Sequence, residues 1–146
     1  MGPVHPQVTH FPIALIITAF LLQIVVVLKP AWLSRSTSLW LLGLAVVLSI
    51  VSALSGQDAA NRAVNLMELS ESTRSLLTTH RRFANLTLWT SLGTFLLWLW
   101  LFLRSPSDRR VDRLALALLF ILSLSVAATG YLGGELVLSH GVGVSP

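Results

Sequence analysis

Histidine is the residue of this sequence best suited to chemistry, and the 146 residues contain four. His5 and His10 precede the first long apolar run, His80 precedes the third, and His140 follows the fourth. If every run crosses a membrane, the starts of the first and third runs lie on the same side as the ends of the second and fourth. All the imidazoles would then lie at one membrane face. Imidazoles at helix ends in a bundle are the usual protein ligands of haem or a transition metal.

We therefore predict one site that contains His10, His80 and His140, as haem or metal ligands. His5 is expected to be peripheral, because it lies nearest the free N-terminus. The alternative interpretation is that these side chains are ordinary interfacial residues that cap helices or reach toward the headgroups.

Other residues near the histidines complete the candidate site. Glu135 lies about one helical turn before His140, where it would hydrogen-bond an imidazole, bind a metal or proton, or simply reach the headgroups. Arg81 and Arg82 would pair with haem propionates or act as interfacial anchors. Small residues permit close approach of another backbone or a flat cofactor, and we predict close packing along one face that contains Ala127, Gly130 and Gly134.

Composition indicates that these residues sit in a membrane protein. The chain is 54% hydrophobic and only 11% charged, with a mean hydropathy of +0.78, whereas soluble domains carry about 25% charged residues. No cysteine is present, which excludes disulfides, iron–sulfur clusters and covalently attached haem. The basic excess is typical of membrane loops rather than of a nucleic-acid surface. No nucleotide-binding or hydrolase motif is present.

The apolar runs predict an all-α, polytopic, four-helix transmembrane bundle in a single domain. The expected spans are residues 11–28, 39–55, 83–103 and 114–139, with Thr9 as a cap before the first and Gly56 ending the second. The polar connection 57–82 predicts one or two amphipathic helices at the membrane interface. Tryptophans near the span ends fit an aromatic belt.

Loop charges predict the orientation. Two short loops on one side carry six basic residues, Lys29, Arg35, Arg104, Arg109, Arg110 and Arg113, against four on the other side, Arg62, Arg74, Arg81 and Arg82. The positive-inside rule places the short loops in the cytoplasm. Both termini and the histidines would then face the periplasm or cell exterior. No basic residue precedes the first run, so it is expected to be a retained span rather than a signal peptide.

Both ends of the chain resemble a bacterial family of four-span predicted membrane proteins, a domain of unknown function. The opening motif is HPxxxHFPIAL, from His5 to Leu15, and the closing motif is GGELVxxHGVGV, from Gly133 to Val144. The resemblance covers essentially the whole chain and includes a histidine before the third run, here His80. It implies a shared fold and histidine set, and its members occur alone or fused to periplasmic redox modules. The chain departs from the family at Leu138 and Ser139, where an aromatic and a basic residue are usual.

The function expected from these residues is electron transfer by a b-type haem subunit of a bacterial inner membrane. Two of His10, His80 and His140 would be axial ligands, which leaves no open iron position and suits an electron carrier or complex subunit better than an enzyme. The partners would be the lipid bilayer, a redox partner or larger complex, and further copies of the chain, with no nucleic acid. The alternatives are a zinc or copper site built from the same histidines with Glu135, and a structural or assembly subunit.

Overall fold

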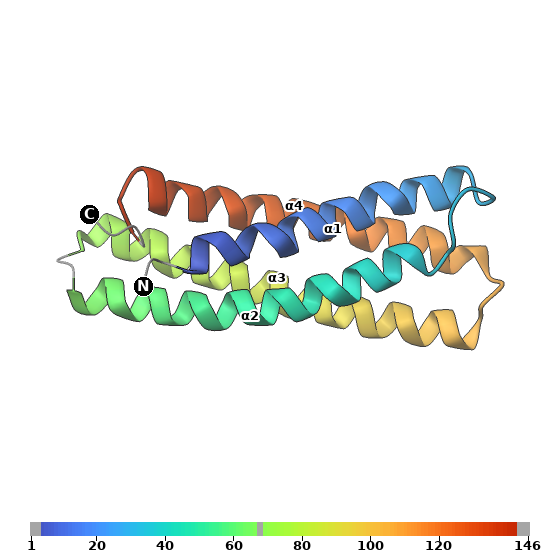
Figure 1. The fold of residues 1–146 in the computed structure, drawn as a ribbon, viewed down its shortest axis with the longest axis horizontal. Coiled ribbons are helices and arrows are strands. Elements are labelled where there is room, and N and C mark those ends of the chain that lie inside the picture. Colours follow the sequence, from blue (N-terminus) through green and yellow to red (C-terminus); the bar gives the residue numbers. More distant parts are fainter. Residues whose placement is uncertain (1–3, 67–68, 143–146) are drawn as a thin grey trace.

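The computed structural model describes residues 4–66 and 69–142, with side chains for all of these except residues 4–7, 62, 63, 65 and 66. Its described residues form four α-helices arranged up and down: α1 (Val4–Leu28), α2 (Thr37–Leu66), α3 (Glu71–Arg104) and α4 (Arg109–Leu138) (Figure 1). Each helix packs against its neighbours in the chain, and α1 also packs against α4. All four are long and apolar enough to cross a membrane. The all-α four-span fold is therefore confirmed.

The helices are longer than the apolar runs that predicted them. At 1.5 Å per residue, the 30 residues of α2 and the 34 of α3 extend about 45 and 51 Å, whereas a bilayer core is about 30 Å thick. Residues 57–66 and 71–82 of the connection are helical, but they continue α2 and α3 instead of forming separate interfacial helices. Gly56 does not end α2, because one glycine costs a helix only about 1 kcal/mol and good helix formers such as Ala59 and Ala60 follow it.

Helix α1 begins at Val4, before the expected cap at Thr9, and so contains Pro12 in its interior. A proline there lacks the N–H that would bond the carbonyl of Val8, four residues earlier. Membrane helices tolerate such a gap because neighbouring groups satisfy the freed carbonyl. Pro12 is buried, so α1 keeps this residue inside the bundle.

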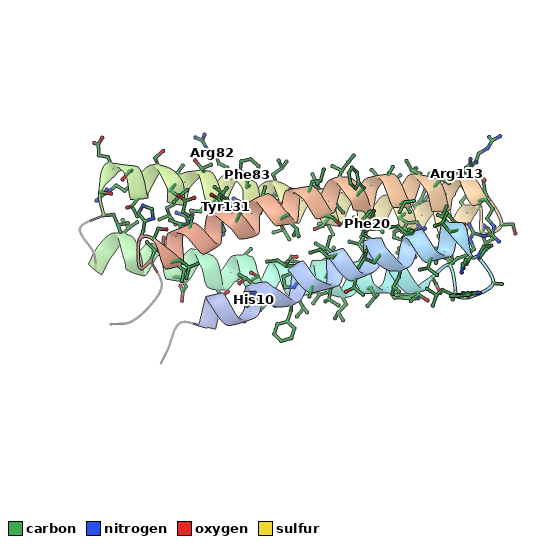
Figure 2. All side chains as sticks on the ribbon, turned by 90° about the horizontal axis from the view of Figure 1, so that it is seen from above. His10, Phe20, Arg82, Phe83, Arg113 and Tyr131 are labelled. Atoms are coloured by element: carbon green, nitrogen blue, oxygen red, sulfur yellow. The ribbon has the colours of Figure 1, made fainter. Side chains whose placement is uncertain are left out.

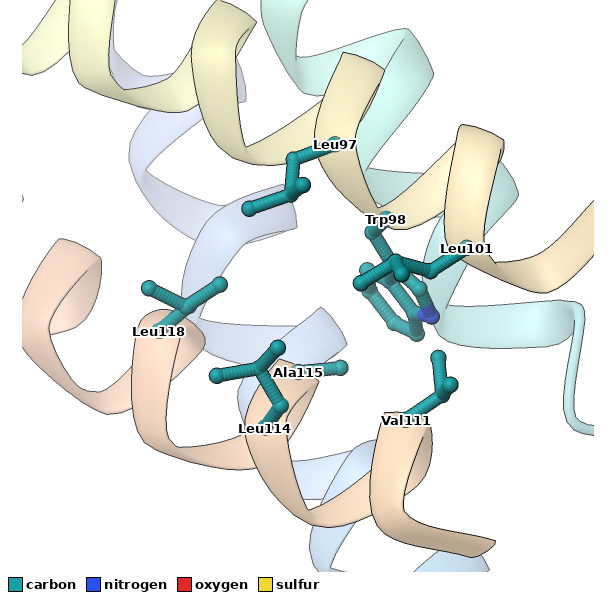
Figure 3. Close-up of a pocket in the computed structure, with 7 residues that line it drawn as sticks. All are labelled: Leu97, Trp98, Leu101, Val111, Leu114, Ala115 and Leu118. Carbon is teal, nitrogen blue, oxygen red and sulfur yellow. The ribbon is translucent and has the colours of Figure 1, made fainter. Parts of the chain in front are cut away.

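The main apolar core fills the half of the bundle next to the two short loops. Its buried residues come from all four helices: Ile16, Ala19, Leu39, Leu42, Ala45, Trp98, Val111, Ala115, Leu119, Leu122 and Val126. Trp98 is 1% exposed and lies between α3 and α4 beside Leu101 and Val111 (Figure 3). Its assignment to the aromatic belt is therefore wrong. Trp32, Trp40, Trp89 and Trp100 are more than half exposed, as residues facing lipid or headgroups would be.

A second, smaller core lies at the opposite end of the bundle. Ala60 from α2, Leu77 from α3, Leu136 from α4 and Val142 after α4 are buried together there. Ser70 starts α3 at this end, where its side-chain oxygen accepts a hydrogen bond from the Thr73 N–H at 3.2 Å. This core explains why α2 and α3 remain helical beyond the bilayer thickness, because their extensions bury apolar side chains against the end of α4.

Candidate functional site

The histidines lie at the end of the bundle away from the two short loops. His10 is exposed on α1, His80 is half-buried on α3, and His140 is half-buried just after α4. Figure 2 shows His10 at the same end as Arg82 and Tyr131, far from Arg113. His5 belongs to the first turns of α1, but its side chain lies outside the described part of the structure.

His80 has the most specific surroundings of these histidines. Its ring atom Nδ1 is 3.1 Å from the carbonyl oxygen of Thr129 on α4. Because a carbonyl only accepts hydrogen bonds, this contact places the proton of the neutral ring on Nδ1 and leaves the lone pair on Nε2. A backbone carbonyl orients many metal-ligating histidines in this way. His80 is therefore in the tautomer that a ligand requires.

Gly133 makes this position of His80 possible. A Cβ atom at residue 133 would lie only 3.1 Å from the Cε1 atom of the His80 ring, closer than ordinary carbon contacts allow. The ring thus packs directly on the backbone of α4. The neighbouring glycines differ: at Gly130 a Cβ would meet only the Cδ1 of Ile13, at 3.5 Å, and at Gly134 it would meet nothing within 4 Å.

The close-packing face predicted along Ala127, Gly130 and Gly134 is therefore wrong. Ala127 is exposed, and Gly134 borders open space within the chain. The close contact falls on Gly133 instead, about 100° around the helix from Gly134. The sequence did not single out Gly133, because the required glycine depends on where the His80 ring lies around the axis of α4. That angular position is set by helix packing and cannot be read from the sequence.

His140 is held by the end of α4. Its Nδ1 is 3.3 Å from the carbonyl oxygen of Glu135, so its Nε2 also keeps the lone pair in the neutral ring. Gly141, with a φ of +61°, turns the chain so that the Val142 N–H bonds the Leu136 carbonyl at 3.0 Å. Burial of Val142 then fixes the segment that carries His140.

The charged side chains of the candidate site have less specific surroundings than the histidines. Arg81 and Arg82 are exposed on α3, and Glu135 is half-buried on α4. In the described part of the chain, neither arginine forms an ion pair with Glu135. Interfacial anchoring accounts for the exposure of both arginines, and their pairing with haem propionates stays a prediction.

Between the two cores lies a zone that we call the histidine layer, formed by residues 8–15, 47–59, 78–86 and 127–135. The structure describes all of these side chains, and among them only Pro12 is buried. A Cβ placed on Gly130 would lie 3.5 Å from Ile13, and one on Gly133 would lie 3.1 Å from His80, so α1, α3 and α4 approach one another at this level. In a close-packed bundle the inward side chains of each helix turn would be buried. The layer is thus less fully covered within the chain than the two cores, and it contains His10 and His80.

A chain of hydroxyl groups leads from the histidine layer toward the main core, and the sequence analysis did not identify it. The Thr87 hydroxyl is 2.6 Å from the Ser125 hydroxyl and 3.1 Å from the Thr129 hydroxyl. The Thr129 carbonyl in turn contacts His80. The spacing of four between Ser125 and Thr129 was the available signal, since it places both on one face of α4. These bonds join α3 to α4 inside the apolar span.

Asp112 and Arg35 form a second polar site at the opposite end, which sequence reasoning also missed. The carboxylate of Asp112 is 2% exposed, and both of its oxygens are 2.9 Å from Nε of Arg35. The same guanidinium donates to the backbone carbonyls of Pro106 and Asp108. Gln23 of α1 donates to the Asp112 carbonyl at 3.0 Å. This cluster ties the loop before α2 to α1 and to the start of α4.

No group of three or more histidine, aspartate or glutamate side chains that could hold a metal ion is present among the described residues. His10, His80 and His140 thus share one end of the bundle without forming a metal-ligand cluster within the chain. Sites with one or two imidazole ligands remain compatible with this arrangement.

Comparison with known proteins identifies the family of the chain but no individual related protein. The model of a family described as Predicted membrane protein (DUF2231) matches residues 1–146. No curated protein and no solved structure matches the chain. The match extends over the whole chain, and the four helices that could span a membrane agree with the description. The chain therefore belongs to the DUF2231 family of predicted membrane proteins.

Proposed function

We propose that this protein binds b-type haem in the histidine layer and transfers electrons as a subunit of a bacterial membrane complex. The observation that carries the proposal is the layer of partly covered side chains between two packed cores, at the level of His10 and His80. When bound, haem would supply one-electron redox chemistry. The chain would hold the group, orient its ligands and exclude water.

The residues of the layer fit a flat, apolar group with imidazole ligands. His80 presents Nε2 with its lone pair, because the Thr129 carbonyl occupies Nδ1. His10 on α1 and His140, just after α4, are the candidates for the second ligand.

Haem is better supported than the zinc or copper alternative. A structural zinc ion takes four protein ligands and a catalytic one takes three, whereas haem needs only one or two. Since the described residues contain no group of three ligands, the same histidines serve haem more readily.

An optical spectrum of the purified full-length protein tests the proposal. Expressed with haem available and extracted in mild detergent, it is expected to show a Soret band, with the sharp visible bands of a six-coordinate low-spin haem on reduction. Elemental analysis of the same sample tests the zinc and copper alternatives. A colourless preparation that takes up no added haemin would overturn the proposal, and zinc or copper at one ion per chain would replace it.

The proposal includes an orientation, with the histidine layer and both termini on the periplasmic or outer side. Its support is the excess of basic residues in and next to the short loops 29–36 and 105–108. A periplasm-active reporter fused after Pro146 is expected to be active, whereas the same reporter inserted within 105–108 should be silent. The opposite pattern would reverse the orientation and leave the position of the layer within the bundle unchanged.

A further inference from the structure

A surface pocket lies at the loop end of the bundle, between α1 and α4. It encloses about 330 Å³ and is lined by Val27, Pro30, Arg109, Asp112 and Arg113. This volume lies at the lower end of the range for small-molecule sites. The site is separate from the histidine layer, since Arg113 lies at the far end of the molecule from His10 (Figure 2).

The pocket carries net positive charge. Asp112 is its acidic residue, but that carboxylate is held by Nε of Arg35 at 2.9 Å from each oxygen. The nearest guanidinium nitrogen of Arg109 lies 3.9 Å from it, with the Arg109 side chain 56% exposed. Arg113 is also exposed. Two guanidinium groups therefore remain available to an anion, and guanidinium matches the geometry of phosphate oxygens.

The seam below the pocket is apolar and faces outward. Phe20 of α1 and Phe120 of α4 lie along it with ring centroids 5.8 Å apart, and Phe120 is 50% exposed. Val27 lies two turns after Phe20 on the same face of α1, and Arg113 lies two turns before Phe120 on the same face of α4, so the seam leads to the pocket. A ligand that matches the whole feature has a phosphate at one end and a hydrocarbon chain at the other.

We propose that this pocket binds the phosphate of an anionic phospholipid headgroup, with Arg109 and Arg113 on the phosphate and an acyl chain along Phe20 and Phe120. The position suits this ligand, because both arginines lie at the start of a membrane-spanning helix, at headgroup level. A free phosphate would use the arginines but would gain nothing from the apolar seam.

Lipid retention by the full-length protein tests the proposal. Protein from vesicles of phosphatidylcholine with phosphatidylglycerol is examined by native mass spectrometry, and its thermal unfolding is followed with each lipid. We expect selective retention of phosphatidylglycerol and a higher unfolding temperature with that lipid. The double variant Arg109→Gln, Arg113→Gln should bind it at least about 10-fold more weakly, because it removes the charge-assisted hydrogen bonds to the phosphate.

The matched control is Arg104→Gln with Arg110→Gln, which removes the same charge from the same end of the molecule but leaves the pocket lining intact. This control should keep the phosphatidylglycerol preference within about twofold, because neither side chain lines the pocket. An equal loss in both double variants would show a general surface charge effect and overturn the site. Displacement of the lipid by inorganic phosphate would make soluble phosphate the ligand, and unchanged retention in the pocket variant would also refute the proposal.

Discussion

Replacing Arg35 by alanine is expected to lower the free energy of unfolding by about 3–5 kcal/mol. The variant leaves the carboxylate of Asp112, which is 2% exposed, without its close partner. It also removes donors to the carbonyls of Pro106 and Asp108, so the two short loops lose their attachment to each other. Thermal or denaturant unfolding in a neutral detergent measures the effect.

Arg109→Ala is the matched control for this experiment. Its guanidinium is 3.9 Å from the same carboxylate but is mostly exposed, so its removal should change the unfolding free energy by no more than about 1 kcal/mol. The double variant Arg35→Met, Asp112→Leu should recover most of the stability, because it removes both buried charges together. Equal destabilisation by Arg35→Ala and Arg109→Ala would show that the pair is not the dominant interaction at this end.

The sequence was sufficient to predict the four spans for a physical reason. A chain that crosses lipid must satisfy its backbone hydrogen bonds internally, so each long apolar run has to be a helix. The same argument places His10, His80 and His140 at one end, because the number of spans decides the side of each helix end. The apolar pattern could not locate the true end of α2, because polar residues follow Gly56 while helix formers such as Ala59 and Ala60 keep the segment helical.

The contacts that specify the two polar sites were not predictable from the sequence. Arg35 and Asp112 are separated by 77 positions, and nothing in their local spacing distinguishes them from the other charged residues of the short loops. His80 and Gly133 meet only because α3 and α4 pack with a particular rotation. A shift of one residue turns a helix by 100°, and the sequence alone contains several glycines that would serve.

Replacing His80 by alanine is expected to remove haem almost completely from the purified protein. Loss of an outer-shell partner of a ligand typically costs about 10–100-fold in affinity, and loss of the ligand itself should exceed that. Haem content per chain, from the Soret absorbance, measures the result. The variants His10→Ala and His140→Ala identify the second axial ligand, because only one of them should lose haem to a comparable extent. His5→Ala, which changes the histidine predicted to be peripheral, should retain haem.

Gly133→Leu tests the same site without altering any ligand. The new side chain would occupy the position of the His80 ring, whose Cε1 lies 3.1 Å from the Cβ position. We expect haem content to fall at least about 10-fold and the unfolding free energy of the haem-free protein to fall by about 1–3 kcal/mol. Gly134→Leu is the matched control for stability, because its Cβ meets nothing within 4 Å. That variant should leave the unfolding free energy of the haem-free protein unchanged or raise it by up to about 1 kcal/mol, because leucine is the better helix former. If the two leucine variants were equally stable and both retained haem, His80 would not rest on Gly133, and the histidine layer would not be the haem site.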